Sequence, residues 1–343
     1  MVLQATDCKY DISMKTGIIS GGYLQRPPLC MGERRLDNRL ITEVFKHLQT
    51  RQNVVLSGLA GSGKAYFLQQ LVKVAAGKCL CLVPGEEKAY DLRGQLRVFT
   101  TDDHIHLFLG RDFVFLKENY SQAEGSRVSA LQECLYHTRR NGFIICTPAS
   151  FMHYMMPPQQ MMNKTIKINQ TQDYSRDQLL RELVGIGYRR VAVVNQPGDF
   201  SVKGGIVDIY PLGASTPYRL EYFGDMVESI RRFSTDSQRS AGREKQVFIP
   251  PADELSGSLE ATLLDYLPEQ AALFIDKPRD FIKSYQKNLR GYRETIKEAH
   301  KQTQAVRALP LLGVDALQGL LKARPAVYHS FFPGNIPQVT TAM

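Results

Sequence analysis

The chain has 343 residues and is 43% hydrophobic, which is enough to build more than one core, because single cores rarely grow beyond about 250–300 residues. Its formal charge of +9 favours an anionic partner, either nucleic acid or an acidic protein surface. We find no run of roughly 20 apolar residues and no secretion signal over residues 1–30, so we expect a cytoplasmic protein without a membrane anchor. The 6 cysteines contain no Cys-x-x-Cys pair, which favours reduced thiols over a metal site.

Helical and apolar segments alternate in the first part of the chain. The pattern predicts helices over residues 36–48, 86–96 and 126–140, and buried strands over 54–56, 79–83, 105–109 and 142–147. Strands that alternate with helices are typical of a parallel, doubly wound α/β sheet.

A phosphate-loop pattern follows the first of these strands. Gly58, Gly61 and Gly63 can turn backbone N–H groups toward phosphate oxygens. The next residue, Lys64, adds a positive charge at the start of a helix. The pattern then requires Ser or Thr, whose hydroxyl binds magnesium, whereas Ala65 has no oxygen to offer. The loop is therefore degenerate as a nucleotide site.

A motor ATPase also needs an acidic pair at the end of a strand. The nearest candidate is the single Asp276, and the neighbouring Lys277 would compete for its carboxylate. We therefore expect no enzymatic activity from this chain and no required cofactor or metal. Weak binding of a nucleotide or a sulfate at Gly63 and Lys64 stays open as an alternative to a purely structural turn.

The character of the chain changes after residue 162. A helix over 175–184 is followed by short β-rich segments between Gly and Pro residues, at 190–194, 200–203, 206–210, 218–223 and 227–233. From residue 252 the α/β character returns, with a helix over 259–267, a strand over 271–275, a long charged helix over 280–302 and a strand over 326–328.

The simplest organisation is one domain interrupted by another. We expect a leader over residues 1–30 and a P-loop-like, parallel-sheet α/β domain made of 31–162 plus 252–343. We expect an inserted α+β domain over 163–251, built on an antiparallel sheet with a helix packed on it.

Several motifs in the inserted domain are highly specific in order and spacing. They are Gly187-Tyr188-Arg189, Gly-Asp-Phe-Ser-Val-Lys-Gly-Gly-Ile-Val-Asp-Ile-Tyr-Pro at 198–211, Tyr-Arg-Leu-Glu-Tyr-Phe-Gly-Asp at 218–225 and Asp-Ser-Gln-Arg-Ser at 236–240. Together they resemble the UvrB-like N-terminal module of the bacterial transcription-repair coupling factors (Mfd). The resemblance implies a cytoplasmic repair protein, of which this chain is the N-terminal portion. The complete protein would be an ATP-dependent DNA translocase that removes RNA polymerase stalled at lesions, contacting polymerase and DNA through domains beyond this chain.

The same resemblance implies a docking site. In this family the inserted domain binds the repair protein UvrA, and Arg189, Lys203 and Tyr210 fall in the matching motifs. Strand alternation places Ile206 and Asp208 on the face of Tyr210, and this mixture suits a partner surface better than a core. Two further cations complete the predicted UvrA site, Arg190 and Arg219. A solvated basic face without a partner is the alternative.

UvrB-type proteins, which bind damaged DNA in a nucleotide-dependent way, are the rival family because they share this two-domain module. They carry a long tyrosine-rich hairpin, whereas the interval 104–125 is short here and Tyr120 is its sole tyrosine. They also keep the hydroxyl residue that Ala65 replaces. We therefore expect a non-catalytic adaptor that recruits UvrA and keep the UvrB type as the alternative.

Overall fold

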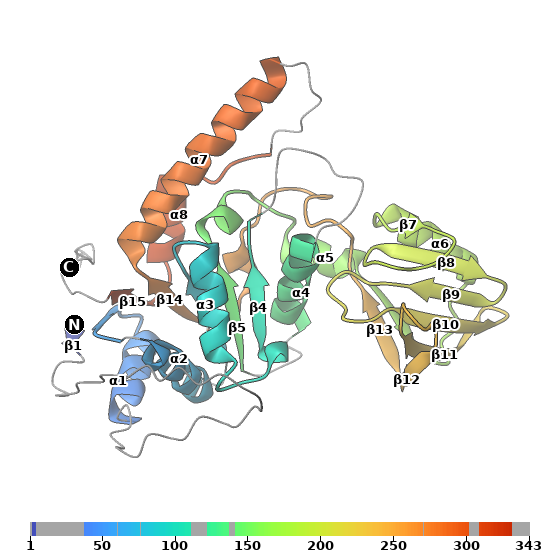
Figure 1. Cartoon of the computed structure of the whole chain (residues 1–343), viewed down its shortest axis with the longest axis horizontal. Coiled ribbons are helices and arrows are strands. Elements are labelled where there is room, and N and C mark those ends of the chain that lie inside the picture. The colour runs from blue at the N-terminus through green and yellow to red at the C-terminus, as the bar shows by residue number, and fades with distance from the viewer. Residues whose placement is uncertain are drawn as a thin grey trace, which may run out of the picture.

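The computed structural model describes residues 2–4, 38–59, 61–75, 77–110, 122–136, 141–269, 271–301 and 309–330. These residues form a larger α/β body and a smaller β-rich body (Figure 1). Most of the predicted leader and the interval around Tyr120 lie outside the described residues. Among the described helices, none combines the length and the apolar composition needed to cross a membrane.

A parallel sheet forms the centre of the larger body. Its strand order is β1-β2-β15-β14-β3-β5-β4, and every neighbouring pair is parallel. The strands are β1 (Val2–Gln4), β2 (Val54–Ser57), β3 (Lys78–Leu82), β4 (Ile105–Phe108), β5 (Gly142–Cys146), β14 (Ala272–Asp276) and β15 (Ala326–Ser330). Because β14 and β15 lie between β2 and β3, the last part of the chain completes the middle of the sheet. The predicted α/β fold with an insertion is confirmed.

Alternating side chains of these strands feed two cores, one on each face of the sheet. In β3, Leu80 and Leu82 belong to one core, and Cys79 and Cys81 to the other. The second core is covered by α1 (Asn38–Gln49), α2 (Ser62–Ala75) and α3 (Glu86–Leu96). The first is covered by α4 (Gln122–Tyr136), α7 (Pro278–Lys301) and α8 (Val314–Lys322). Burial on both faces explains why the strands are continuously apolar.

The smaller body is built on a six-stranded sheet of order β12-β11-β10-β9-β8-β7. The strands are β7 (Arg189–Arg190), β8 (Asp199–Lys203), β9 (Ile206–Ile209), β10 (Tyr218–Phe223), β11 (Met226–Phe233) and β12 (Ser240–Glu244). All neighbours are antiparallel except β7 and β8. One face packs against α6 (Arg176–Gly185) and a two-stranded sheet of β6 (Ile166–Asn169) and β13 (Gln246–Ile249). The predicted meander with one packed helix is confirmed.

Several local predictions failed. The helix expected over 259–267 is only a 3-10 turn, η4 (Leu263–Tyr266), because Ala261 instead bridges Met155 in extended conformation and Thr262 caps the turn. The helix α5 (Pro158–Lys164) and the helix α8 were not predicted. The strand expected over 190–194 ends at Arg190.

Specific contacts join the two bodies at α4. Val128 of this helix belongs to the core of the smaller body, and Arg127 donates from Nε to Oε1 of Glu254 at 2.7 Å. Gly213 has a φ of 80°, and a Cβ there would lie 2.9 Å from the Cα of Ser129. Close backbone approach at Gly213 and a core shared through Val128 thus fix the smaller body against the larger one.

Candidate functional site

The phosphate loop joins β2 to α2 and has the predicted turn. Gly58 and Gly61 adopt φ angles of 85° and 51°, which glycine tolerates without strain. Gly63 lies in the first turn of α2, where an added Cβ would have nothing within 4 Å. Ala65 is 0% exposed and packs in the core beneath α2. The position that would carry the magnesium-binding hydroxyl is therefore a core position here.

Lys64 is bound by the protein itself. Its Nζ lies 2.6 Å from Oδ2 of Asp276, whose side chain is only 2% exposed at the end of β14. The second oxygen, Oδ1, lies 2.7 Å from Nδ1 of His329 on the neighbouring β15. Burial raises the pKa of the Asp276 carboxyl, but the hydrogen bond from His329 and the charge of Lys64 outweigh it, so the pKa lies below its usual value.

This ion pair differs from the sequence prediction in one respect. A lysine does compete for Asp276, but it is the loop's own Lys64 rather than the neighbouring Lys277, which is exposed. The pairing ties the start of α2 to the two strands contributed by the last part of the chain. The arrangement neutralises the cation that a phosphate loop would present to a nucleotide.

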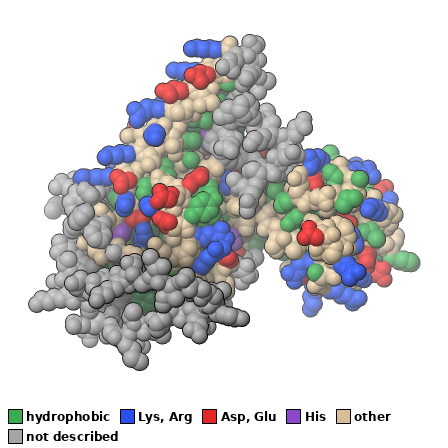
Figure 2. All heavy atoms as spheres, in the orientation of Figure 1, with side chains coloured by type: hydrophobic (Ala, Val, Ile, Leu, Met, Phe, Trp, Pro, Cys, Tyr) green, Lys and Arg blue, Asp and Glu red, His purple; other side chains and the backbone are tan. Residues whose placement is uncertain are grey.

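The outer face of the smaller sheet is the side turned away from α6. Strand alternation puts Val207 and Ile209 in the core beneath α6 and their neighbours on the outer face. We define the outer face as Asp199, Ser201, Lys203, Ile206, Asp208, Tyr210, Arg219, Glu221, Phe223, Ser229, Arg231, Phe233 and Arg243. Lys and Arg side chains are prominent on the surface of this body (Figure 2).

Two of the predicted docking residues, Arg189 and Arg190, lie on opposite faces of the smaller sheet. Arg189 pairs in register with Asp199 and binds its Oδ1 through Nη2 at 2.9 Å, beside the outer face. Arg190 pairs in register with Phe200, which lies in the core under α6. Successive residues of a strand point to opposite faces, so the two arginines cannot serve one flat surface.

Arg219 is held by Asp208. The guanidinium donates from Nε to Oδ1 at 2.7 Å and from Nη2 to Oδ2 at 2.8 Å, and it lies 4.7 Å above the ring of Phe233. The Asp208 side chain is 7% exposed, and that of Arg219 is 21% exposed. Asp208, predicted as a contact residue, thus orients Arg219 along the outer face and keeps no free carboxylate oxygen.

Lys203 and Ile206 flank a tight hairpin. Gly204 has a φ of 59°, which favours glycine, and a Cβ on Gly205 would crowd the carbonyl oxygen of Tyr222 at 3.0 Å. Lys203 is exposed, and Ile206 is half-buried. Their neighbour on the face, Tyr210, is also half-buried, and its hydroxyl donates to the carbonyl oxygen of Ser215 at 3.1 Å. Burial raises the pKa of Tyr210.

Phe223 is an outer-face residue that the sequence prediction missed. Its side chain is 75% exposed at the last position of β10, before the turn at Gly224. This turn lies at the same end of the sheet as the hairpin of Lys203, because β9 and β10 run antiparallel. The sequence contained a signal for this exposure. Phe223 shares the outward alternation of Arg219 and stands directly before a Gly-Asp turn.

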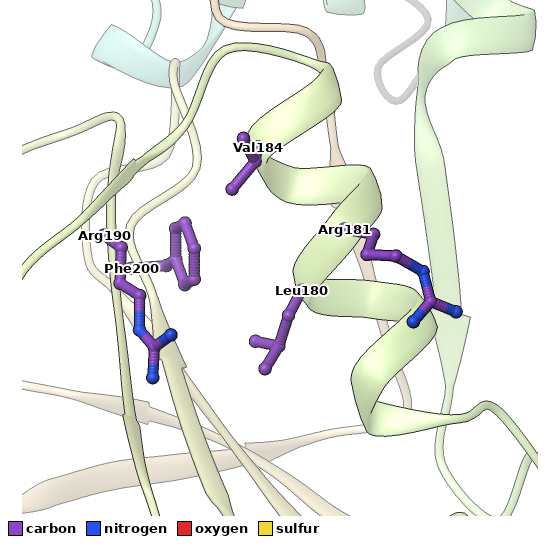
Figure 3. Close-up of a pocket in the computed structure, with 5 residues that line it drawn as sticks. All are labelled: Leu180, Arg181, Val184, Arg190 and Phe200. Carbon is purple, nitrogen blue, oxygen red and sulfur yellow. The ribbon is translucent and has the colours of Figure 1, made fainter.

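Arg190 lines a shallow groove between α6 and β7 (Figure 3). The groove has a volume of about 310 Å³ and is also lined by Leu180, Arg181, Val184 and Phe200. Val184 is 60% exposed, whereas Phe200 forms the buried floor. The groove is apolar with an arginine on each side, and it lies on the face opposite Lys203 and Arg219.

Comparison with known proteins identifies the smaller body. Residues 166–255 match the family described as the UvrB interaction domain. The chain is 30% identical over 202 residues to the transcription-repair-coupling factor of Bacillus subtilis, covering 59% of this chain and 17% of that protein. It is 31% identical over 231 residues to the factor of Myxococcus xanthus, covering 65% of this chain and 19% of that protein.

The UvrABC system protein B of Chlorobium limicola is 28% identical over 212 residues, covering 57% of this chain and 31% of that protein. The matches span less than a fifth of the coupling factors and about a third of the UvrB protein. The resemblance inferred from the motifs is confirmed. Residues 166–255 match the UvrB interaction domain, and over about 60% of its length the chain is similar to the N-terminal UvrB-like part of transcription-repair-coupling factors.

Proposed function

We propose that this chain is the N-terminal portion of a transcription-repair-coupling factor and acts there as a non-catalytic adaptor. In this role the outer face of the smaller sheet recruits UvrA, in the bacterial cytoplasm, to RNA polymerase stalled at a DNA lesion. The observation that carries the proposal is the match of residues 166–255 to the UvrB interaction domain. Translocation along DNA and contact with polymerase belong, in this proposal, to parts of the protein beyond this chain.

The chemistry of the outer face supports a protein partner. Lys203 is exposed next to the hairpin, Phe223 extends from the same end of the sheet, and Arg219 keeps its guanidinium oriented through Asp208. Arginine and exposed aromatic side chains are typical of the residues that dominate protein interfaces. The positive charge fits an acidic surface on UvrA.

The phosphate loop supports the non-catalytic part of the proposal. A phosphate group that approached Lys64 would have to displace the carboxylate of Asp276 and would bring further negative charge beside it. Ala65 offers no ligand for magnesium and lies in the core. We infer that the loop serves to join the start of α2 to β14 and β15, and that ATP hydrolysis in the complete protein is performed elsewhere.

The test is a titration of the purified chain with UvrA, measured by isothermal calorimetry. Lys203→Ala combined with Phe223→Ala should weaken the UvrA complex at least about tenfold, because both side chains are exposed at one end of the outer face. Lys46→Ala combined with Lys73→Ala, two exposed cations of the larger body, should leave it unchanged. Equal UvrA affinity for both double variants would contradict the proposed docking face.

The similarity to the UvrABC system protein B keeps one second candidate, a nucleotide-dependent protein that binds damaged DNA. Titration with ATP and magnesium separates the two functions. The adaptor should show no heat of ATP binding at micromolar protein concentration. Tight, magnesium-dependent ATP binding without a UvrA complex would favour the UvrB type.

A further inference from the structure

The helix α7 (Pro278–Lys301) is the longest element that the structure describes and extends beyond the parallel sheet (Figure 1). Its 24 residues correspond to a length of about 36 Å at 1.5 Å per residue. The sequence predicted this helix but left its charge without a function. The fold now decides which of its faces is turned outward.

The inner face of α7 is fixed by packing. Phe281, Tyr285, Leu289 and Tyr292 are buried in the core of the larger body. The hydroxyl of Tyr285 donates to the carbonyl oxygen of Leu312 at 2.8 Å. These contacts hold the helix in one rotation about its axis, so the opposite side is presented to solvent along the whole length.

The opposite side carries a basic stripe, which we define as the seven Lys and Arg residues of the helix. At about 100° per residue, they all fall within an arc of about 120° that lies opposite the buried residues. All are exposed. The members of the basic stripe are Arg279, Lys283, Lys287, Arg290, Arg293, Lys297 and Lys301.

Acidic residues do not neutralise this stripe. The helix has three carboxylates, and only Glu294 falls within the arc, while Asp280 and Glu298 lie at its margin. Among the described residues, no ion pair of 4.0 Å or less joins a stripe cation to a carboxylate. Seven cations against three anions leave +4 on one helix of a chain whose total is +9. Figure 2 shows Lys and Arg side chains following one another along α7.

We propose that the basic stripe of α7 binds the phosphate backbone of duplex DNA. From Arg279 to Lys301 the stripe is about 33 Å long, close to the roughly 34 Å of one turn of the double helix. A row of cations at intervals of about 5–6 Å suits a polymer that presents repeated phosphates, and a small anion would use only one or two of them.

Two other partners fit the stripe less well. A membrane surface would need an apolar face to insert, and the apolar face of α7 is already buried against the larger body. The centre of a protein interface is depleted in lysine, whereas the stripe contains four, Lys283, Lys287, Lys297 and Lys301. Phosphate contacts are the common use of exposed Lys and Arg in a row.

The test measures binding of the whole chain to a fluorescein-labelled 30-base-pair duplex by anisotropy between 50 and 200 mM salt. In the stripe variant, Lys283, Lys287, Arg290 and Lys297 are replaced by Gln, whose helix propensity is close to theirs. We expect binding at least about tenfold weaker at 100 mM salt and a salt slope reduced by about 2–4. Unchanged circular dichroism and UvrA binding would show that the variant is folded.

The matched control removes the same charge elsewhere. Lys46, Lys73, Arg239 and Lys245 are exposed, lie away from α7 and are replaced together by Gln. The control should bind the duplex less than about threefold more weakly than the wild type. Its basic stripe is intact, and only the overall charge of the chain has fallen. Equal losses in the two variants would overturn the proposal. Displacement of the duplex by polyglutamate as effectively as by unlabelled duplex would overturn it too, by assigning the stripe to an acidic protein.

Discussion

The phosphate loop and the outer face of the smaller sheet both contain a basic side chain that binds a buried aspartate, with opposite consequences. Lys64 forms an ion pair with Asp276, and the Lys64 side chain is only 18% exposed. Arg219 also uses both of its shorter hydrogen bonds on Asp208, but its guanidinium lies along a surface that carries further exposed cations. The first pairing makes the Lys64 ammonium unavailable to a ligand. The second holds the Arg219 guanidinium in a fixed orientation at a surface.

This difference shows that a motif predicts backbone shape more securely than it predicts chemistry. The glycines at 58 and 61 produce the turn that the motif requires. The charge of Lys64, however, is decided by a strand more than 200 positions later in the chain. Predictions that remove each aspartate or arginine in turn can separate the structural role from the docking role.

The largest expected effect is that of Asp276→Ala. It would leave the Lys64 ammonium and the Nδ1–H of His329 without their buried partner and should destabilise the chain by about 3 kcal/mol. Urea unfolding followed by circular dichroism measures the loss. Asp236→Ala, at an exposed position, is the control and should stay within about 0.5 kcal/mol. A loss as small as that of the control would mean that the pair has no structural role.

The second effect concerns Arg219→Ala in the smaller sheet. The substitution leaves the buried carboxylate of Asp208 without its cation and removes the guanidinium above the Phe233 ring. We therefore expect the free energy of unfolding to fall by about 2 kcal/mol. Arg243→Ala lies in the same row across the strands but is exposed, and it should cost less than about 0.5 kcal/mol. If the two variants unfolded at the same urea concentration, Asp208 would not anchor the face.

The pH dependence of stability provides the third effect. The pKa of Asp276 is held below its usual value, so its contribution is complete above the unfolded-state pKa of about 3.9 and is lost as the pH falls through the folded-state pKa. We expect the difference in unfolding free energy between the wild type and Asp276→Asn to be fully present at pH 5. It should narrow as the pH falls below about 4, and urea unfolding at each pH measures it. A difference that widened toward low pH would reverse the assigned direction.

Sequence patterns were sufficient for the elements whose burial is one-sided or complete. The continuous apolar strands and the period of α7 were predicted because neighbours in sequence determine them. The partner of Lys64 could not be predicted, because it depends on β14 entering the sheet beside β3.

Only part of the candidate docking site could be predicted, because some of its features also depend on how the strands pair. Alternation along β9 predicted that Ile206 and Asp208 share the face of Tyr210, and the structure places the alternate residues Val207 and Ile209 in the core. The orientation of Arg190 depends on the parallel pairing of β7 with β8, which no local pattern contains. The exposure of Phe223 at the end of β10 was missed, although its alternation with Arg219 before the Gly-Asp turn was a local signal for it.

The smallest expected effect on stability is that of Lys203→Arg. Because the side chain is exposed, the free energy of unfolding should change by less than about 0.5 kcal/mol. UvrA binding should become tighter by about threefold to tenfold, since a guanidinium can pair with a carboxylate through two parallel hydrogen bonds. Lys245→Arg, an exposed position outside the outer face, is the matched control and should leave the dissociation constant unchanged. Equal UvrA affinity for the two variants, measured by calorimetry, would move the docking site away from the Lys203 hairpin while leaving the role of Lys64 untouched.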